Sequence, residues 1–236
     1  MPNDTLGLYI NKGNGMQIQN SGVCKKQGDR SECEIYAHTG SGWTKIYPRQ
    51  QDYNIPNGSN GGIGLSTVRS GYSSWKTGRA MQGYYSGNEG RPLQSIGHIF
   101  WNNGKPTFPG TLVGISRVRL SIIRNINTGS YNSTVTGYLR MSNLRNSGTW
   151  NQCIGTVQSS PQFTFTWGVG GTTTTIDNNA NLNDFMYKFF TNGTYQSLCL
   201  YTGETGANVS YGGGNWSRNY AGTSSVSIEI WAQYQT

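Results

Sequence analysis

From residue 65 onward, apolar and polar residues alternate in short segments that turn-rich stretches separate. A period of two residues indicates a strand with one buried face. The longest segment of this kind is TLVGISRVRLSIIRNI, whose apolar anchors are Val113, Ile115, Val118, Leu120 and Ile122. The alternation changes phase between Gly114 and Ser116, which predicts a β-bulge in an otherwise continuous strand.

The same alternation recurs in five further segments, SIGHIFW, STVTGYLRMSNL, QFTFTWGV, SLCLYTG and SVSIEIWAQY. In SIGHIFW it places Ile96, His98 and Phe100 on one face of the strand. NLNDFMYKFFTNG has no Pro or Gly until its end and predicts a short helix or a pair of strands. About eight short strands without long helices between them indicate a sandwich or barrel. We predict an all-β fold with an antiparallel β-sandwich of jelly-roll type over residues 65–236.

Residues 1–57 have the pattern of a separate small module of β-hairpins. LGLYINKGNGMQIQ contains two short runs around a Lys-Gly-Asn-Gly turn signal, and VCKKQGDRSECEIYAHTGSGWTKIYP twice returns through a Gly-centred turn. Trp43, Ile46 and Tyr47 close the last strand, which Pro48 ends. Because isolated hairpins are marginally stable, we expect this arm to dock on a neighbouring surface through those three residues. GSNGGIG, residues 58–64, predicts a flexible hinge before the sandwich.

The composition supports an all-β protein with polar, uncharged loops. Gly occurs 34 times in 236 residues, about twice its usual share, and charged residues make up 12%, about half the usual level. Strong helix formers are scarce, whereas Thr, Tyr and other residues that suit a pleated sheet are plentiful. Disordered chains carry more charge and fewer aromatic residues, so the composition excludes a disordered chain.

The formal net charge of +8 permits binding to an anionic partner. The Lys and Arg residues are scattered, however, and their densest group is Arg117, Arg119 and Arg124. Alternation places Arg117 and Arg119 together on the solvent face of a strand. We therefore expect no dedicated nucleic-acid surface, while attraction to acidic cell-surface polymers remains open.

The chain has four cysteines, and their pattern does not match a metal site. No C-x-x-C occurs, and His38 and His98 lie far apart in the sequence. Cys24 and Cys33 are spaced for a bridge across a hairpin, but buried or free thiols are the more common outcome. The start, MPNDTLGLYINKG, lacks the features of a signal peptide, and no apolar run is long enough to span a membrane. We expect a product made in the cytosol.

Signals of catalysis are weak. No nucleophile motif or phosphate-binding loop occurs, and the spacing of Asp177, Asp184 and Glu204 does not indicate an acid pair. These side chains are expected to be loop carboxylates that accept bonds from backbone N–H groups. IDNNANLND offers oxygen ligands for calcium, yet its spacing departs from the standard twelve-residue loop. We predict no catalytic residue, no bound metal and no cofactor.

Aromatic residues in Gly-rich loops are the more informative feature. GYSSWKTGR, MQGYYSGNEGR and YGGGNWSRNY combine Tyr and Trp with Asn, Ser and Arg. Such loops suit the stacking of a sugar ring or docking to a protein. We expect Trp75, Trp101 and Trp167 to lie in the core. The candidate residues for binding a glycan or a partner are Tyr84, Tyr85, Tyr211, Trp216 and Arg218.

Two parts of the chain resemble virion proteins of tailed bacteriophages. IYAHTGSGWTKIYP resembles the hairpin tags of such proteins that end in W-x-K-x-Y-P, and LYINKGNGMQIQNSGVCKKQGD is similar in character. SWKTGRAMQGYYSGNEGRPLQSIGHIFW, followed by FPGTLVGISRVRLSI, resembles jelly-roll domains at the ends of tail and fibre proteins. The resemblance implies a virion structural protein. Its arm, residues 1–57, would bind other virion proteins, its β-domain would face the host, and it would form a homo-oligomer, with a trimer favoured.

The chain departs from this pattern because it has no repetitive shaft, and the cysteines of the arm are not part of the usual tag. The resemblance therefore implies a short tail or head fibre that attaches to the host surface, with a glycan as the receptor. One alternative is a capsid decoration or cementing protein without receptor binding. A free carbohydrate-binding module is another. A polysaccharide hydrolase is disfavoured because no acid pair is evident.

Overall fold

The structure is a computed structural model of the whole chain. It describes residues 8–11, 16–19, 35–38, 43–47, 50–71, 76–86, 92–126, 132–146, 148–211 and 214–235. The first four strands pair as two separate antiparallel hairpins, namely β1 (Leu8–Asn11) with β2 (Met16–Gln19) and β3 (Ile35–His38) with β4 (Trp43–Tyr47). Trp43, Ile46 and Tyr47 lie in β4, but their side chains lie outside the described residues, so their docking role stays a prediction.

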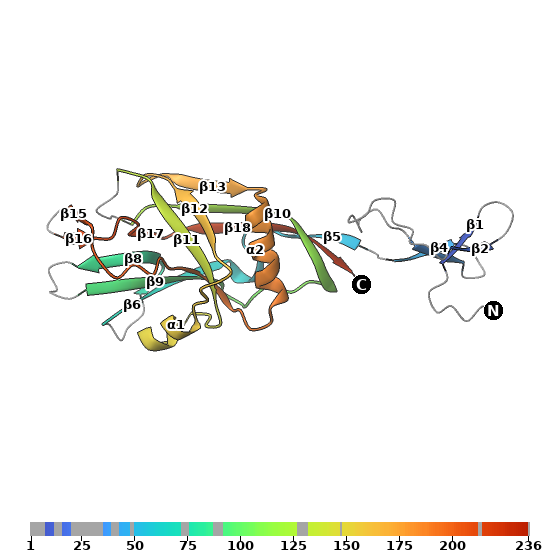
Figure 1. Cartoon of the computed structure of the whole chain (residues 1–236), viewed down its shortest axis with the longest axis horizontal. Coiled ribbons are helices and arrows are strands. Elements are labelled where there is room, and N and C mark those ends of the chain that lie inside the picture. The colour runs from blue at the N-terminus through green and yellow to red at the C-terminus, as the bar shows by residue number, and fades with distance from the viewer. Residues whose placement is uncertain are drawn as a thin grey trace.

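The body of the protein is an antiparallel β-sandwich, as the sequence predicts (Figure 1). Its smaller sheet has the order β13-β10-β18-β5. These strands are β5 (Gln50–Ile55), β10 (Thr111–Ile123), β13 (Thr173–Asp177) and β18 (Val226–Gln235). The register of β10 against β18 shifts at two places, between Leu112 and Gly114 and between Ile115 and Arg117, which confirms the predicted bulge.

The larger sheet has the path β12-β11-β14-β9-β8-β16-β15, with β6 beside β9, β7 beside β6 and β17 beside β8. Its strands are β6 (Ile63–Arg69), β7 (Lys76–Thr77), β8 (Ala80–Ser86), β9 (Pro92–Trp101), β11 (Val135–Ser142), β12 (Phe163–Trp167), β14 (Ser197–Leu200), β15 (Val209–Tyr211), β16 (Gly214–Trp216) and β17 (Ala221–Thr223). All of its pairings are antiparallel.

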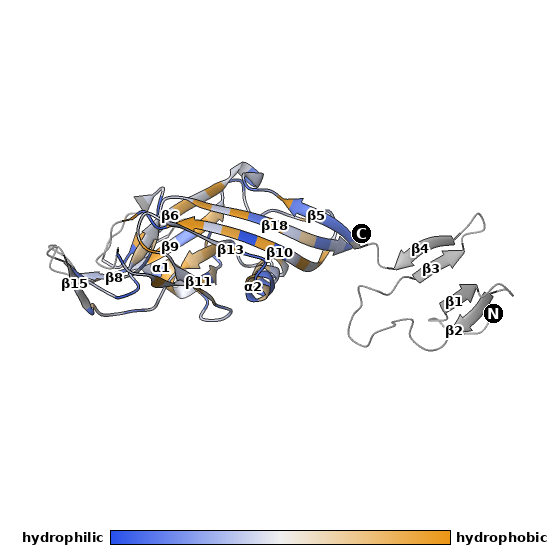
Figure 2. Ribbon diagram, turned by 90° about the horizontal axis from the view of Figure 1, so that it is seen from above, coloured by the Kyte–Doolittle hydropathy of each residue, from blue (hydrophilic) through white to orange (hydrophobic). Residues whose placement is uncertain are grey.

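The main core lies between the two sheets and is closed by the helix α2 (Ala180–Thr191). The segment NLNDFMYKFFTNG, for which the sequence allowed either a helix or a pair of strands, thus forms a helix. Its buried residues recur at helical spacing, and Asn179 caps its first turn by accepting bonds from two backbone N–H groups. Apolar residues recur along the strands of the body (Figure 2), and those of the main core lie between the sheets. Trp101 and Trp167 are buried as expected, whereas Trp75 lies outside the described residues.

A second, smaller apolar cluster lies on the outer face of the larger sheet. The short helix α1 (Trp150–Thr156) places Cys153 against Cys199, Val68 and Ile96. A capping box of Thr149 and Gln152 starts this helix. Both thiols are free and fully buried, as expected, while Cys24 and Cys33 lie outside the described residues. Neither α-helix in the described part of the chain is long and apolar enough to cross a bilayer.

The sandwich begins earlier in the chain than residue 65. Strand β5, inside the range 1–57 that we assigned to the arm, pairs with β18 along its whole length. The Gly-rich stretch that follows contains the short 3-10 helix η2 (Ser59–Gly61) and is bonded to β9 and its following turn, because Asn102 N–H and Asn103 N–H donate to Gly62 and Asn60. These bonds dock residues 58–62 against the sandwich as a turn, and residues 63–64 begin β6, which corrects the expectation of a flexible hinge over residues 58–64.

Candidate functional site

An aromatic cluster lies at the end of the sandwich formed by β8, β15 and β16, opposite the end where β18 reaches the C-terminus (Figure 1). Tyr85 of β8 and Trp216 of β16 are direct partners across an antiparallel ladder. Their ring centroids are 4.1 Å apart with an interplanar angle of 26°, so the rings stack. Both residues are half-buried, so each keeps part of its surface open to solvent.

Tyr220 completes this cluster, and the sequence analysis did not select it. Its ring centroid lies 4.8 Å from that of Trp216 and 6.0 Å from that of Tyr85. The side chain is buried, and its hydroxyl accepts a hydrogen bond of 2.8 Å from Arg69 Nη2. Burial raises the pKa of Tyr220 to about 12, so the phenol stays neutral in ordinary buffers. The only sequence signal for Tyr220 was its place at the end of YGGGNWSRNY.

Glycine at position 83 allows this cluster to form. Gly83 has a φ of +91°, a conformation that side-chain-bearing residues rarely adopt. A Cβ at this position would lie 2.7 Å from Tyr220 Cα and 2.8 Å from Ser217 Oγ. The turn from Ser217 to Tyr220 therefore packs directly on the backbone of β8.

Buried hydrogen bonds hold the same turn in place. Ser217 N–H donates to Tyr84 O at 2.9 Å, and Ser217 Oγ accepts from Tyr84 N–H at 2.9 Å. Gln82 is fully buried, and its Nε2 donates to Asn219 O and to Thr136 O. Asn219 Nδ2 in turn donates to Glu204 Oε1 at 2.9 Å. This network ties the β16–β17 turn to β8 and β11 and fixes Trp216 and Tyr220 relative to Tyr85.

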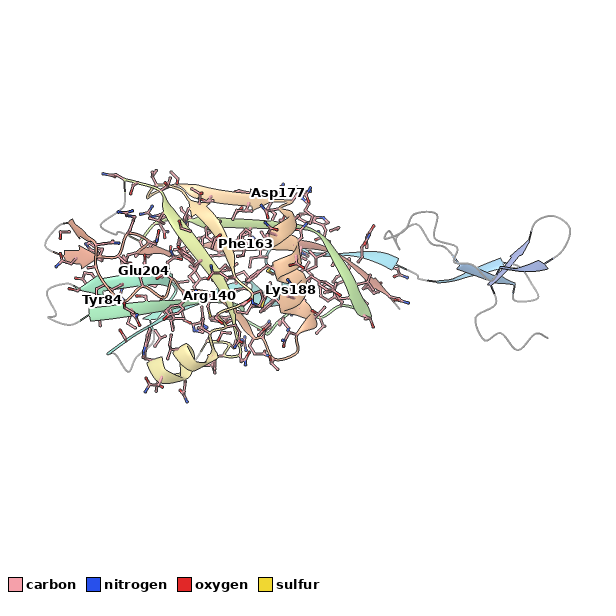
Figure 3. The ribbon with its side chains drawn as sticks, in the orientation of Figure 1. Tyr84, Arg140, Phe163, Asp177, Lys188 and Glu204 are labelled. Carbon is pink, nitrogen blue, oxygen red and sulfur yellow. The ribbon has the colours of Figure 1, made fainter. Side chains whose placement is uncertain are left out.

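The structure unites only part of the predicted binding set. Tyr85 and Trp216 are brought together, and Arg218 is exposed in the turn that follows Trp216. Tyr84 is half-buried and points to the opposite face of the sheet, because successive side chains of a strand alternate. Its partner in β9 is Gln94, whose Nε2 donates to Glu204 O at 3.0 Å; Tyr84 and Glu204 are both labelled in Figure 3. Tyr211 pairs with Gly214 through its backbone, and its side chain lies outside the described residues.

Two of the candidate acids in the described part of the body, Asp177 and Asp184, are each held in ion pairs. Asp177 accepts bonds of 2.7 Å from Arg117 Nε and Nη2 and of 3.1 and 3.0 Å from Arg119. Hydrogen bonding to Arg117 holds the pKa of Asp177 well below its usual range. Asp184 pairs with Lys188 at 2.7 Å. The expectation of a loop carboxylate bonded to backbone N–H groups is thus wrong for Asp177, because two strand arginines lie opposite it.

Three further observations bear on catalysis and metal binding. Figure 3 shows Asp177 and Glu204 in different parts of the body, so they do not form an acid pair. Asn179, one of the candidate calcium ligands, is engaged in capping α2. Among the described residues there is no group of three or more His, Cys, Asp or Glu side chains placed to hold a metal ion.

Arg117 and Arg119 are exposed as the strand pattern predicts, whereas the third arginine of the group, Arg124, is not. Arg117 and Arg119 lie on the outer face of the smaller sheet, with side chains 39% and 43% exposed. Arg117 also stacks over the Trp231 ring, 4.6 Å from its centroid. Arg124 is instead fully buried and donates to the carbonyls of Ser133 and Gly168. The three arginines therefore do not form one surface.

One histidine lies beside a cysteine, but both are sealed from solvent. His98 Nδ1 lies 2.9 Å from Ser197 Oγ and 3.4 Å from Cys199 Sγ. Burial lowers the pKa of His98 to about 4 and raises the pKa of Cys199 to about 12. A reactive cysteine requires an accessible thiolate. This pair is neutral and buried, so it belongs to the packing of the outer face.

Comparisons with known proteins returned no match for this chain. No family model matches the sequence, and neither a curated protein nor a solved structure does.

Proposed function

We propose that this protein is a non-enzymatic attachment protein that binds a cell-surface glycan at the aromatic cluster of Tyr85, Trp216 and Tyr220. The observation that carries the proposal is the stacked, half-buried pair of Tyr85 and Trp216 at the end of the sandwich. Aromatic rings that are held rigid present apolar area with little loss of conformational entropy on binding. The apolar face of a pyranose ring is a suitable partner for such a surface.

Polar and charged groups beside the cluster supply the second part of this chemistry. Arg218 is exposed in the turn that follows Trp216, and its guanidinium can donate hydrogen bonds to sugar hydroxyls. The net charge of +8 favours approach to acidic polymers on a cell surface. The bond that Gln82 donates to Asn219 O and the two bonds that Ser217 exchanges with the Tyr84 backbone already fix the loop, so binding requires little further ordering.

We propose further that the protein is a virion component of a tailed bacteriophage. In this proposal residues 1–57 bind other virion proteins, the sandwich faces the host, and the assembly is a homo-oligomer, with a trimer favoured. The support is the resemblance of the W-x-K-x-Y-P hairpin to phage tags. Antibody labelling of intact particles tests it, because decoration is expected and unlabelled particles would contradict it. A particle that is labelled, yet binds no glycan, would favour capsid cementing instead.

A glycan array tests the attachment site. We expect the intact protein to bind a subset of surface glycans and Trp216→Ala to weaken that binding by at least about fivefold, since a stacked aromatic residue contributes roughly 1 to 3 kcal/mol. Trp231→Ala is the matched control, because Trp231 is also half-buried but lies on the outer face of the other sheet. An array without signal, or equal binding by the Trp216 variant, would sink the proposal.

A further inference from the structure

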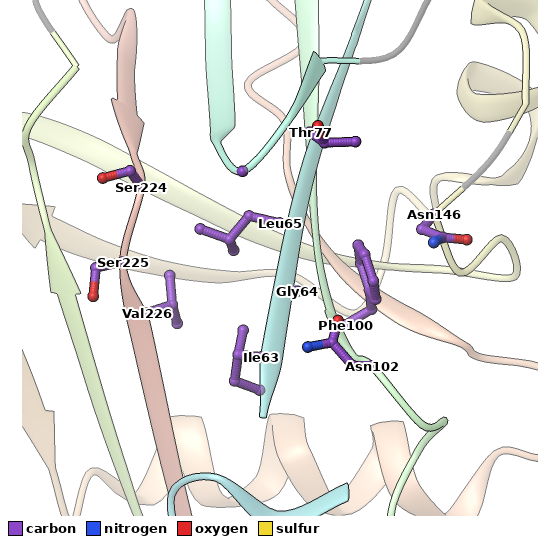
Figure 4. A pocket seen from close by; sticks show the side chains of 11 residues that line it. Ile63, Gly64, Leu65, Thr77, Phe100, Asn102, Asn146, Ser224, Ser225 and Val226 are labelled. Atoms are coloured by element: carbon purple, nitrogen blue, oxygen red, sulfur yellow. The ribbon is translucent and has the colours of Figure 1, made fainter. Parts of the chain in front are cut away.

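A second concave surface lies at an edge of the larger sheet and shares no residue with the aromatic cluster (Figure 4). It has a volume of about 470 Å³, within the range of small-ligand sites. The described residues that line it come from β6, β7, β9, the turn before α1 and the β17–β18 turn. They are Ile63, Gly64, Leu65, Thr77, Gly78, Phe100, Asn102, Asn146, Ser224, Ser225 and Val226.

The floor of this hollow is a short free edge of β6. Gly62 O accepts a hydrogen bond from Asn102 N–H. Because every second residue of an antiparallel strand bonds the same neighbouring strand, the backbone N–H and C=O of Gly64 also point toward β9, whereas those of Ile63 point away from it. Strand β7 covers β6 only at Ser66 and Thr67, and Gly78 N–H donates to Leu65 O. No described strand pairs with Ile63 on this side. Its N–H and C=O therefore point away from β9, toward the side of β6 that no described strand covers at this residue.

The two walls of the hollow are apolar and differ in shape. Ile63, Leu65 and Val226 lie on one side of β6, and Phe100 lies on the other (Figure 4). A Cβ at position 64 would lie 2.5 Å from Phe100 Cε2, so glycine lets the aromatic ring lie against the strand. A ligand at this edge would meet an aromatic ring on one side and branched aliphatic side chains on the other.

Neighbouring groups already orient the hydrogen-bonding side chains. Asn102 Nδ2 donates to Gly61 O at 2.8 Å, and its Oδ1 lies beside Gly64, where a Cβ would come within 2.4 Å of it. Ser224 Oγ accepts from Asn125 Nδ2 at 2.6 Å, which leaves its proton to donate elsewhere. Asn102 thus presents an acceptor and Ser224 a donor to the hollow.

These features favour a neutral, polyhydroxylated ligand. None of the described lining residues is charged, so the lining itself offers no ion pair to a charged ligand. Five of the lining side chains are amides or hydroxyls, which match sugar hydroxyls. An added peptide strand would need hydrogen bonds along several residues of an edge, whereas Leu65 O is already bonded to Gly78.

We propose that this hollow is a binding site for a neutral sugar of one or two rings, seated on the free edge of β6 between Phe100 and Val226. The site is separate from the aromatic cluster and takes a ligand without charge. It gives the protein a second point of contact with a glycan chain, or with a different neutral saccharide.

Titration of the isotope-labelled full chain, followed by backbone amide resonances, tests this site. The probes are the methyl glycosides of glucose, galactose, mannose and N-acetylglucosamine, with glucuronic acid and a neutral tripeptide for comparison. We expect at least one neutral glycoside to shift the amides of residues 63–65 and 224–226 with a Kd below about 20 mM. Glucuronic acid and the tripeptide should bind at least about tenfold more weakly.

Two variants locate the binding. Thr77→Tyr places a large side chain at the mouth of the hollow, and we expect it to weaken binding by at least about tenfold. The matched control is Thr166→Tyr, an exposed threonine of β12 outside the hollow, which should bind like the parent protein. Asn146→Ala is a milder change at an exposed residue and should weaken binding about threefold.

Each outcome decides the proposal. No shift for any glycoside, equal binding by Thr77→Tyr, or preferred binding of the acid or the tripeptide would overturn it. The Trp216→Ala variant separates the two sites, because it should lose the glycan signal of the aromatic cluster while the amides around Ile63 still respond. If the amides around Ile63 do not respond to any glycoside while Trp216→Ala still weakens binding on the glycan array, the second site is refuted and the attachment proposal stands.

Discussion

The buried His98 predicts that the folded protein loses stability in mild acid. His98 is fully buried on β9, with Ser197 and Cys199 of β14 beside it. Burial lowers its pKa from 6.5 to about 4. In the unfolded chain this histidine is protonated near its ordinary pKa of 6.5. Between pH 6.5 and about pH 4 the unfolded state therefore binds a proton that the folded state does not bind.

The size and direction of the effect follow from the two pKa values. Above pH 6.5 neither state binds the proton, and the contribution of His98 to stability is fully present. It falls as the pH drops, by about 2 kcal/mol at pH 5 and by about 3 kcal/mol below pH 4, since one pKa unit corresponds to roughly 1.4 kcal/mol. The carboxyl of Asp177, whose pKa is lowered, contributes only in more acidic solution than this window.

Urea denaturation at about pH 7 and about pH 5 measures this difference. The free energy of unfolding of the parent protein should fall by about 2 kcal/mol between the two conditions. In His98→Gln the protein is less stable at both pH values, but this pH-dependent step should largely disappear. His38→Gln removes the chain's other histidine and should keep the step of the parent protein.

Two results would refute the reasoning. One is an unfolding free energy that does not change between the two conditions. The other is a step of unchanged size in His98→Gln, which would assign the proton to a different group. Ring-proton resonances of His98 provide a direct check, since they should not titrate above about pH 5 in the folded protein.

Two further predictions concern backbone conformation and thiol accessibility. Gly83→Ala should lower the free energy of unfolding by about 2 to 4 kcal/mol, because it combines a left-handed backbone with a clash against Tyr220. Gly78→Ala, with a similar φ of +75° and nothing within 4 Å of the added Cβ, should cost only about 1 to 2 kcal/mol; equal thermal shifts would contradict this account. Cys153 and Cys199 are buried, and desolvation raises both pKa values to about 12, so neither should react with a thiol reagent until the protein unfolds. Labelling in a Cys24→Ser/Cys33→Ser background measures this, and rapid modification of the native protein would show that the outer cluster opens.

Local periodicity was sufficient to predict most elements of the sandwich. The bulge of β10 was evident because an extra residue shifts the apolar side chains to the other face, as the register at Gly114 shows. Helix α2 remained ambiguous in the sequence, since its four buried residues fit a helix while the aromatic content also suits strands. Helix α1 was missed because it is too short to establish a helical period, and its capping box is the one local signal.

Pairing between distant segments was beyond what a single sequence shows. The partner of Asp177 is fixed by the register of β10 against β13, which sets Arg119 directly opposite it. Likewise, β5 was assigned to the arm because a Gly-rich stretch follows it, although its pairing with β18 makes it part of the sandwich. Neither contact leaves a trace in the local pattern of either segment, because each depends on which strands become neighbours.

The candidate site shows the same division between local and long-range information. Aromatic residues in Gly-rich loops identified Tyr85 and Trp216, yet the sequence could not tell that they stack on each other and on Tyr220. That arrangement depends on Gly83, where the absence of a side chain lets a turn more than a hundred residues later pack on β8. Gly64 has the same role at the free edge of β6, where it admits the ring of Phe100. At both surfaces a glycine allows one segment to approach another closely, so the shape of each site is set by a residue that contributes no side chain to it.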